Sequence, residues 1–535
     1  MNAKYWMVTG AALMAATSWG KLETSRIFSS NMVLQRDKPV PVWGKAAPGE
    51  KVTVSFADQS VAATADDKGA WRATLKPLAA SKENRALVVQ GAAEKIEYAN
   101  VLVGDVWVCS GQSNMEMSFS WGVYDGDKFK AESAQFPTIR RIKIRKCKRN
   151  LPEAYDVPAE GAWSKACDTF QGCSATGWFF ARKLVQELDV PIGLLESNWS
   201  GCRIEPFMSP ESFKGDPSLK QFADALEIGD PGTEPGKKAW ADAAAAAETW
   251  AAEFKAAVAA GKTFGKAAPG FPGANAPGDA ARQYNSMIAP IVSFPVKGAI
   301  WYQGCSNGGE DESYLVKLAQ LADGWRRAWG EELPFYWVQL ASFTGATSDP
   351  AGGNGYARIR DAMRRALDKI PHGGMAVTID VGNASDIHPK AKIFVGERLA
   401  LWALAKDYGK NVVCTGPLFK KMTVEEPELE GDPVSVVLEF DGVGSGLMVG
   451  KKNPADNSPV VADPGAKLEG FALADADRKW HWADAKIVGK TVVLTCDQVK
   501  APVAVRYAHR ANPMGHCNLY NKEGLPASPF RTDNW

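Results

Sequence analysis

Between Leu102 and Tyr408 the sequence alternates between short apolar runs, typical of buried strands, and longer amphipathic stretches, typical of helices. The expected strands are 102–109, 192–197, 298–302, 335–340 and 376–380, and the expected helices are 176–188, 314–329, 358–370 and 393–408. Such alternation predicts a mostly parallel sheet covered by helices on both faces. No other feature constrains the fold as strongly.

The segments on either side carry a different pattern. Between residues 27 and 100, apolar and polar residues alternate with period two, as at Val52, Val54 and Phe56, and short strand patterns return after residue 416. A chain of 535 residues also exceeds the size at which one hydrophobic core stops growing. We therefore predict an N-terminal β domain at 21–100, an α/β domain at 101–415 with an excursion of helix and loop at about 210–283, and a C-terminal β domain at 416–535.

The first twenty residues have the pattern of an export signal. Lys4 precedes an apolar run that ends in small residues around Ala15, Ala16 and Ser18, and this run is too short to span a bilayer. We expect residues 1–20 to be a signal peptide and the mature chain to be periplasmic or extracellular, without stable membrane insertion. A formal net charge of +1 argues against nucleic acid as a partner.

The cysteines do not define a metal site or a disulfide framework. There are nine, an odd number with irregular spacing, so at least one thiol is free or intermolecular. No pair of them is matched at zinc-ligand spacing. We expect no structural metal and no cofactor.

Four polar segments follow predicted strands, and ligands of such sheets bind at the carboxyl ends of the strands. The segments are Ser110-Gly111-Gln112-Ser113-Asn114, Asn198-Trp199-Ser200-Gly201, Gln303-Gly304-Cys305-Ser306-Asn307, and Asp380 through Asp386-Ile387-His388-Pro389. Each is typical of an ordinary turn when taken alone. Together they supply the parts of an acyl-transfer site, which favours a hydrolase.

In that interpretation Ser113 is the nucleophile, and Gly111 allows the tight turn that exposes its hydroxyl. His388 is the general base, and Asp386 is the nearest carboxylate that can orient it. The oxyanion donors are the amides of Ser113 and Gly201 and the side-chain amide of Gln303, one such donor being worth about 3 kcal/mol.

Longer motifs resemble those of the sialate O-acetylesterase family, within the SGNH-type hydrolases. They cover nearly the whole mature chain and include Asn31-Met-Val-Leu-Gln35, Val106-Trp-Val-Cys-Ser-Gly-Gln-Ser-Asn-Met-Glu-Met117, Glu196-Ser-Asn-Trp199, Gly298-Ala-Ile-Trp-Tyr-Gln-Gly304, Asp386-Ile-His-Pro389 and Gly524-Leu-Pro-Ala-Ser-Pro-Phe-Arg531. The resemblance implies a flavodoxin-like, doubly wound parallel sheet with flanking β domains. It also implies Ser113 as nucleophile, His388 as base, no metal or cofactor, and Gln303 in the oxyanion hole where the wider group has asparagine.

The chain departs from the family pattern at two places. Cys305 stands where the family commonly has glutamate, and Ser385 stands where the wider group often has its aspartate. Asp386, Asp380 or a backbone carbonyl therefore orients His388. Cys305 is itself a candidate nucleophile, but Ser113 already fills that role in the resemblance.

The sequence thus predicts an exported serine esterase that removes acetyl groups from a glycan or sialic acid. Three alternatives remain open: an acetylxylan-type esterase, a lipase-like esterase of the wider group, and a non-catalytic glycan-binding protein that stacks tryptophans on sugars. Trp107 and Trp301 lie in apolar strands and are expected in the core. The sequence does not indicate the oligomeric state.

Overall fold

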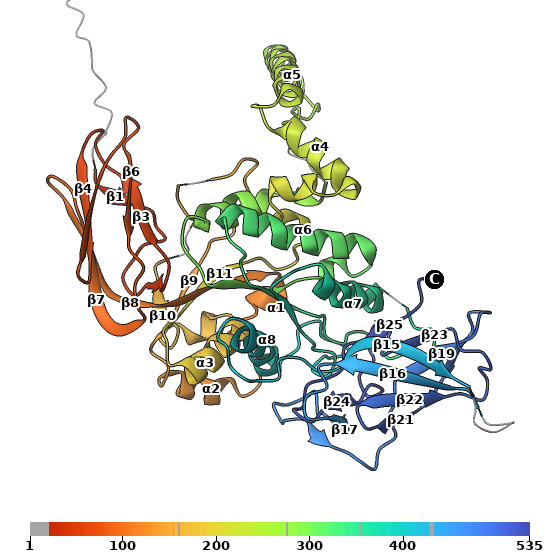
Figure 1. Cartoon of the computed structure of the whole chain (residues 1–535). Coiled ribbons are helices and arrows are strands. Elements are labelled where there is room, and N and C mark those ends of the chain that lie inside the picture. Colours follow the sequence, from red (N-terminus) through yellow and green to blue (C-terminus); the bar gives the residue numbers. More distant parts are fainter. Residues whose placement is uncertain (1–20, 154, 159–160, 274–276, 354, 427–432) are drawn as a thin grey trace, which may run out of the picture.

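A parallel sheet forms the centre of the computed structural model, which describes residues 21–153, 155–158, 161–273, 277–353, 355–426 and 433–535 (Figure 1). The strand order is β10-β9-β11-β8-β12-β13-β14, and every neighbouring pair is parallel except β10 and β9. The predicted signal peptide at 1–20 lies outside the described residues. The strands are β8 (Lys95–Gly111), β9 (Ile139–Lys143), β10 (Ser164–Lys165), β11 (Ile192–Asn198), β12 (Gly298–Tyr302), β13 (Phe335–Val338) and β14 (Gly373–Ala376).

Helices cover both faces of this sheet. Figure 1 shows α3 (Ala175–Leu188) and α8 (Lys392–Lys406) on one side and α6 (Glu312–Trp329) and α7 (Gly355–Arg365) on the other, and contacts join the members of each pair. Two shorter helices, α1 (Ser113–Glu116) and α2 (Gly126–Ser133), follow β8. The predicted α/β architecture is confirmed.

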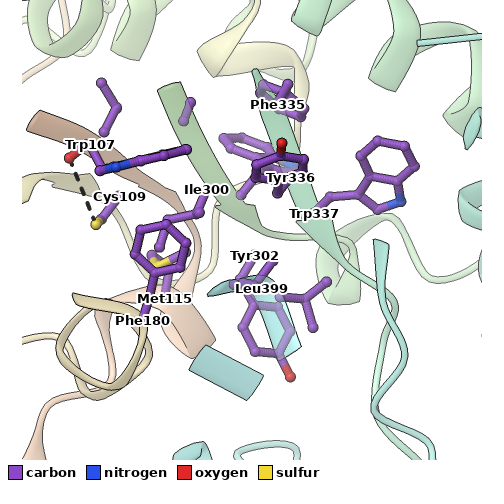
Figure 2. Packing of buried hydrophobic residues seen from close by; sticks show 14 of the residues in the cluster. Trp107, Cys109, Met115, Phe180, Ile300, Tyr302, Phe335, Tyr336, Trp337 and Leu399 are labelled. Carbon is purple, nitrogen blue, oxygen red and sulfur yellow. Dashed lines mark hydrogen bonds between the residues drawn. The ribbon is translucent and has the colours of Figure 1, made fainter. Parts of the chain in front are cut away.

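The core between sheet and helices is rich in large aromatic side chains (Figure 2). Trp107 and Trp301 are at most 1% exposed, as expected for core residues. The Trp107 ring meets Phe180 of α3 edge to face, with centroids 4.9 Å apart, and such pairs add about 0.5–1.5 kcal/mol to the burial of their area. This packing holds the strands whose carboxyl ends carry the polar segments.

The clearest differences from the predicted central strands are at β9 and β14. β9 was not predicted, because Arg140 and Arg141 interrupt its apolar pattern; both are paired, Arg140 with Asn31 and Arg141 with Glu196. The last strand was expected at 376–380, but β14 spans Gly373–Ala376. Its glycines are required by packing, since a Cβ on Gly374 would lie 2.4 Å from the Trp402 ring.

The N-terminal strands are antiparallel except for β2, which pairs in parallel with β8. They are β1 (Glu23–Thr24), β2 (Val33–Gln35), β3 (Val40–Lys45), β4 (Lys51–Phe56), β5 (Gln59–Thr64), β6 (Ala70–Leu75) and β7 (Ser81–Gln90). β8 pairs with β7 and β2 in its first part and with β11 and β12 in its second. The domain boundary proposed at residue 100 therefore falls inside one strand.

The C-terminal region, in blue in Figure 1, consists of small antiparallel sheets, with the orders β15-β16-β22-β21, β18-β17-β24 and β20-β19-β23-β25. Its strands are β15 (Leu418–Glu425), β16 (Ser435–Asp441), β17 (Leu447–Lys451), β18 (Val461–Ala462), β19 (Phe471–Ala474), β20 (Trp480–Trp482), β21 (Asp484–Val488), β22 (Thr491–Thr495), β23 (Ala504–Tyr507), β24 (Leu519–Asn521) and β25 (Phe530–Arg531).

The excursion at about 210–283 contains α4 (Lys220–Gly229) and α5 (Glu234–Ala259), which project from the body in Figure 1. In the described part of the chain, no disulfide joins any of the cysteines. The same residues include no helix with the length and apolarity needed to span a membrane.

Candidate active site

Ser113 lies at a tight turn between β8 and α1. Gly111 before it has φ +132°, and a Cβ there would lie 2.2 Å from the carbonyl oxygen of Tyr302 on β12. The Gln112 amide donates to that same oxygen at 3.0 Å. Only glycine fits at position 111, so the turn is fixed against the neighbouring strand with the Ser113 side chain at its end.

His388 lies in the loop between β14 and α8. Its Nδ1 is 3.3 Å from Asp386 Oδ1, which also accepts a hydrogen bond from the His388 amide at 2.9 Å. Within the described chain, the buried Nε2 has no hydrogen-bond partner. One nitrogen of the ring thus faces a carboxylate and the other is available to a reacting group.

Asn114 joins the serine turn to the histidine loop. Its Nδ2 donates to the Ile387 carbonyl at 3.0 Å, and its Oδ1 accepts from Lys392 Nζ at 2.5 Å. Residues adjacent to Ser113 and His388 are therefore in direct contact. No hydrogen bond joins Ser113 to His388 Nε2 among the described residues. Catalytic hydrogen bonds often tighten only when substrate is bound.

Burial, more than the surrounding charges, lowers the pKa of His388 and keeps its imidazole neutral near pH 7. Burial and the Lys392 ammonium lower the pKa of His388 below its ordinary value, against the opposing effect of Asp386. Burial raises the pKa of Asp386, but the His388 amide and Lys390 outweigh it, so this pKa lies below its ordinary value. A neutral imidazole beside an ionised carboxylate is the state that a general base requires.

The Gly201 segment lies beside the serine turn. The Trp199 amide donates to the Gly111 carbonyl at 3.0 Å, and Ser200 donates to Glu116 of α1 through its amide at 2.8 Å and its hydroxyl at 2.5 Å. Across the described residues, the main-chain amides of Ser113 and Gly201 donate to no other group. Both are available to bind an anion.

The side-chain amide of Gln303, unlike the main-chain amides of Ser113 and Gly201, already has hydrogen-bond partners. Its side chain is buried, and its amide nitrogen donates to the Cys202 carbonyl at 3.1 Å and to Asn307 Oδ1 at 2.8 Å. Its Oε1 accepts from the Tyr314 hydroxyl at 2.9 Å. Both N–H groups are therefore in use, and the geometry favours a role for Gln303 in supporting the loop rather than in donating to an oxyanion.

Asp380 and Cys305, the other residues considered, have separate environments. Both oxygens of Asp380 are paired with the buried Arg398, at 2.6 and 2.7 Å, so Asp380 is not the partner of His388. Cys305 Sγ lies 4.0 Å from Asn114 Nδ2, and burial raises the pKa of its thiol. A raised pKa disfavours the thiolate and hence Cys305 as a nucleophile.

The sequence interpretation missed two residues of the site. The Trp121 ring meets the imidazole of His388 edge to face, with centroids 5.6 Å apart, and is 39% exposed. Lys392 is fully buried four residues after His388. Nothing in the sequence pattern marks Trp121, whereas Lys392 stands in the run His388-Pro-Lys-Ala-Lys392, whose charges just before an apolar helix were a usable signal. The described residues contain no group of three or more His, Cys, Asp or Glu side chains placed to hold a metal ion.

Comparisons with known proteins identify related carbohydrate esterases. Residues 271–405 match the model of a family described as carbohydrate esterase, sialic acid-specific acetylesterase. Sialate O-acetylesterase from Mus musculus is 27% identical, covering 93% of this chain and 92% of its own, and that from Homo sapiens is 26% identical, covering 94% and 91%. The crystal structure of a carbohydrate acetylesterase from Xanthomonas citri is 33% identical, has a TM-score of 0.76, and covers 96% of this chain and 100% of its own.

The fold is of the α/β hydrolase type with flanking β regions, and polar segments gather at the carboxyl edge of its sheet. Together with the comparisons, these features define this chain as a carbohydrate esterase. The similarity extends over nearly the whole length of these relatives. The chain belongs to the sialate O-acetylesterase family.

Proposed function

We propose that this protein hydrolyses acetyl esters on sugar hydroxyls, with Ser113 as nucleophile and His388 as general base. The observation that carries the mechanism is the bridge through Asn114, which brings the serine turn against the histidine loop while His388 Nε2 has no partner in the described chain. The names of the relatives support the acetyl ester as the bond that is cleaved.

In the first step Ser113 Oγ attacks the acetyl carbonyl and His388 Nε2 takes the hydroxyl proton. The oxyanion binds to the main-chain amides of Ser113 and Gly201, each worth about 3 kcal/mol in such sites. The bond between the acetyl carbon and the sugar oxygen breaks, and His388 returns its proton to that oxygen. In the second step His388 takes a proton from water as the water oxygen attacks the acetyl carbon. The bond to Ser113 Oγ then breaks, His388 returns the proton to Oγ, and acetate leaves.

Asp386 orients the imidazole and stabilises its protonated form. This role is supported by the 3.3 Å separation from His388 Nδ1 and by the engagement of Asp380 with Arg398. Gln303 supports the loop after β12 and contributes to the oxyanion site only through the shape it gives that loop.

We further propose the flavodoxin-like layout of the SGNH-type hydrolases for residues 101–415. The order β11-β8-β12-β13-β14, with Ser113 two residues after the end of β8, supports it. The β regions at 21–100 and 416–535 are proposed as the flanking domains. Export to the periplasm or outside is proposed on the pattern of residues 1–20.

The test is acetate release from acetylated sialic acids, acetylated xylan and p-nitrophenyl acetate. Ser113→Ala and His388→Ala are expected to lower kcat by at least about 10³-fold with the fold intact. His372→Ala is the matched control, because His372 precedes β14 at the far edge of the sheet and pairs with Glu332 on the surface. Near-normal turnover in either site variant, or none in the wild type, overturns the proposal.

The same assays separate the alternatives. A glycan-binding protein releases no acetate from any substrate. A lipase-like esterase prefers octanoyl to acetyl esters, whereas a small acetyl pocket reverses that order. Among acetylated sugars, the substrate that loses its acetyl group fastest identifies the substrate class.

A further inference from the structure

A cavity lies outside the candidate active site. Its volume is about 570 Å³, within the range of 300–1,000 Å³ usual for small-molecule sites. It lies between the loop that follows β13 and the C-terminal strands β19 and β20. Its lining includes Thr347, Ser348, Glu469, Trp482, Arg510 and His516.

One wall of the cavity is an aromatic ring held in a fixed position. Trp482 is 40% exposed, and its Nε1 donates to the Ser348 carbonyl at 3.1 Å. The Arg510 guanidinium lies 4.7 Å from the ring centroid, while Arg510 itself is only 3% exposed. The exposed surface of the indole is therefore preorganised, and binding a ligand on it costs little side-chain entropy.

Polar and charged side chains share the lining of this cavity with Trp482. His516 Nδ1 lies 3.3 Å from Glu469 Oε2, and both side chains are about half exposed. Arg510 donates to the Thr347 carbonyl at 2.6 Å, but its buried Nε has no partner among the described residues. Lys467, also at the cavity, pairs with Asp484 at 2.5 Å. Acidic and basic side chains are thus balanced around the cavity.

The loop that forms one side of this cavity also contacts the histidine loop. Ser342, in the same connection after β13, accepts a hydrogen bond from the Asn383 amide at 3.1 Å. Asn383 Oδ1 in turn accepts from the Asp386 amide at 3.2 Å. Two hydrogen bonds therefore separate the cavity loop from the residue that faces His388.

We propose that this cavity binds a neutral sugar unit of a glycan chain, at a distance from the unit whose acetyl group is cleaved. The C–H face of a sugar ring packs on an indole, and its neighbouring hydroxyls pair with carboxylate, imidazole and guanidinium groups. The balanced charge favours a neutral sugar over an anionic one. This inference rests on the proposed function, because it makes the substrate an oligosaccharide or polysaccharide.

Binding is measured first, by titrating unacetylated xylohexaose, cellohexaose and mannohexaose into the full-length Ser113→Ala protein. At least one is expected to bind, and adding Trp482→Ala is expected to weaken that binding about tenfold. Trp535→Ala is the matched control, since this tryptophan is similarly exposed, at 37%, and does not line the cavity. Glu469→Gln keeps the ring in place and is expected to weaken binding about threefold.

Kinetics then link the cavity to catalysis. In Trp482→Ala, the KM for an acetylated hexasaccharide is expected to rise about tenfold, while kcat and the turnover of p-nitrophenyl acetate stay unchanged. Absence of acetate release by the wild type would end the proposed function, but the titration would still decide whether the cavity binds sugar. Failure of all three hexasaccharides to bind, or Trp482-dependent binding of sialyllactose alone, overturns the inference.

Discussion

Lys392→Met removes an ammonium group from the interior next to the serine turn. Lys392 is fully buried, its Nζ donates to Asn114 Oδ1, and the described residues place no carboxylate within 4 Å of it. Burial lowers the pKa of Lys392 from 10.5 to about 7. Methionine has a similar shape but no charge, so the substitution isolates the cost of the ammonium.

The magnitude follows from the two pKa values. The gap between about 7 in the folded chain and 10.5 in the unfolded chain corresponds to about 5 kcal/mol, at 1.36 kcal/mol per pH unit. Between these pH values the unfolded chain binds one more proton, so the stability of the wild type rises with pH. Below pH 7 the full cost is present, and above pH 10.5 it is absent.

We expect Lys392→Met to be more stable than the wild type at pH 6. The gain is about 5 kcal/mol less about 1–3 kcal/mol for the hydrogen bond that Asn114 loses. This advantage should disappear by pH 10. Urea unfolding at pH 6, 8 and 10 measures it, with Lys406→Met, exposed on the same helix, as control. A difference that stays constant from pH 6 to 10 would refute the reasoning.

The same variant tests the electrostatics of His388, the proposed base. Burial is the largest cause of the lowered pKa of His388, and the charge of Lys392 is the next. Removing that charge should therefore raise the pKa of His388. The acidic limb of kcat/KM against pH should then move to higher pH in Lys392→Met. An unchanged limb would mean that Lys392 does not act on the group that titrates.

Three further predictions concern the site and its support. Asp386→Asn should lower the pKa of His388 and reduce kcat at least about tenfold. The pH profile of acetate release measures both effects. An unchanged profile would exclude Asp386 as the residue that orients His388. Arg398→Met leaves the Asp380 carboxylate buried without its partner, so the free energy of unfolding in urea should fall by about 3–5 kcal/mol. Adding Asp380→Asn should recover most of that loss. A fall below about 1 kcal/mol would contradict this prediction. Gly111→Ala should cost at least about 2 kcal/mol and most of the activity, because its Cβ would meet a carbonyl of β12; wild-type stability and turnover together would show that the turn can adapt.

The sequence predicted the central strands well where they are buried on both faces. β12 coincides with the expected 298–302, and β11 extends the expected 192–197 by one residue. β9 was not predicted because Arg140 and Arg141 make its sequence look polar, and only the structure reveals the partners of these largely buried side chains. β14 was placed too late because its two glycines, of which Gly374 packs against the Trp402 ring, have low strand propensity.

For the candidate site, position in the fold was easier to predict than the hydrogen bonds. The polar segments do gather at the carboxyl ends of β8, β11, β12 and β14, because parallel strands end at a common edge. The partners of each side chain depend on distances below 4 Å between segments far apart in the sequence. That is why the double engagement of the Gln303 amide and the bridge through Asn114 were not foreseen.

The length of β8 limits how this enzyme can be divided. Its first part carries the amino-terminal strands β2 and β7, and its last residue lies two positions before Ser113. Cutting the chain near residue 100 would remove β2 and β7 from the first part of a strand that continues to Ser113, and would leave an open edge prone to pairing with other molecules. A shortened version meant for expression or fusion therefore has to keep the amino-terminal sheet, even though that sheet supplies no group to the reaction.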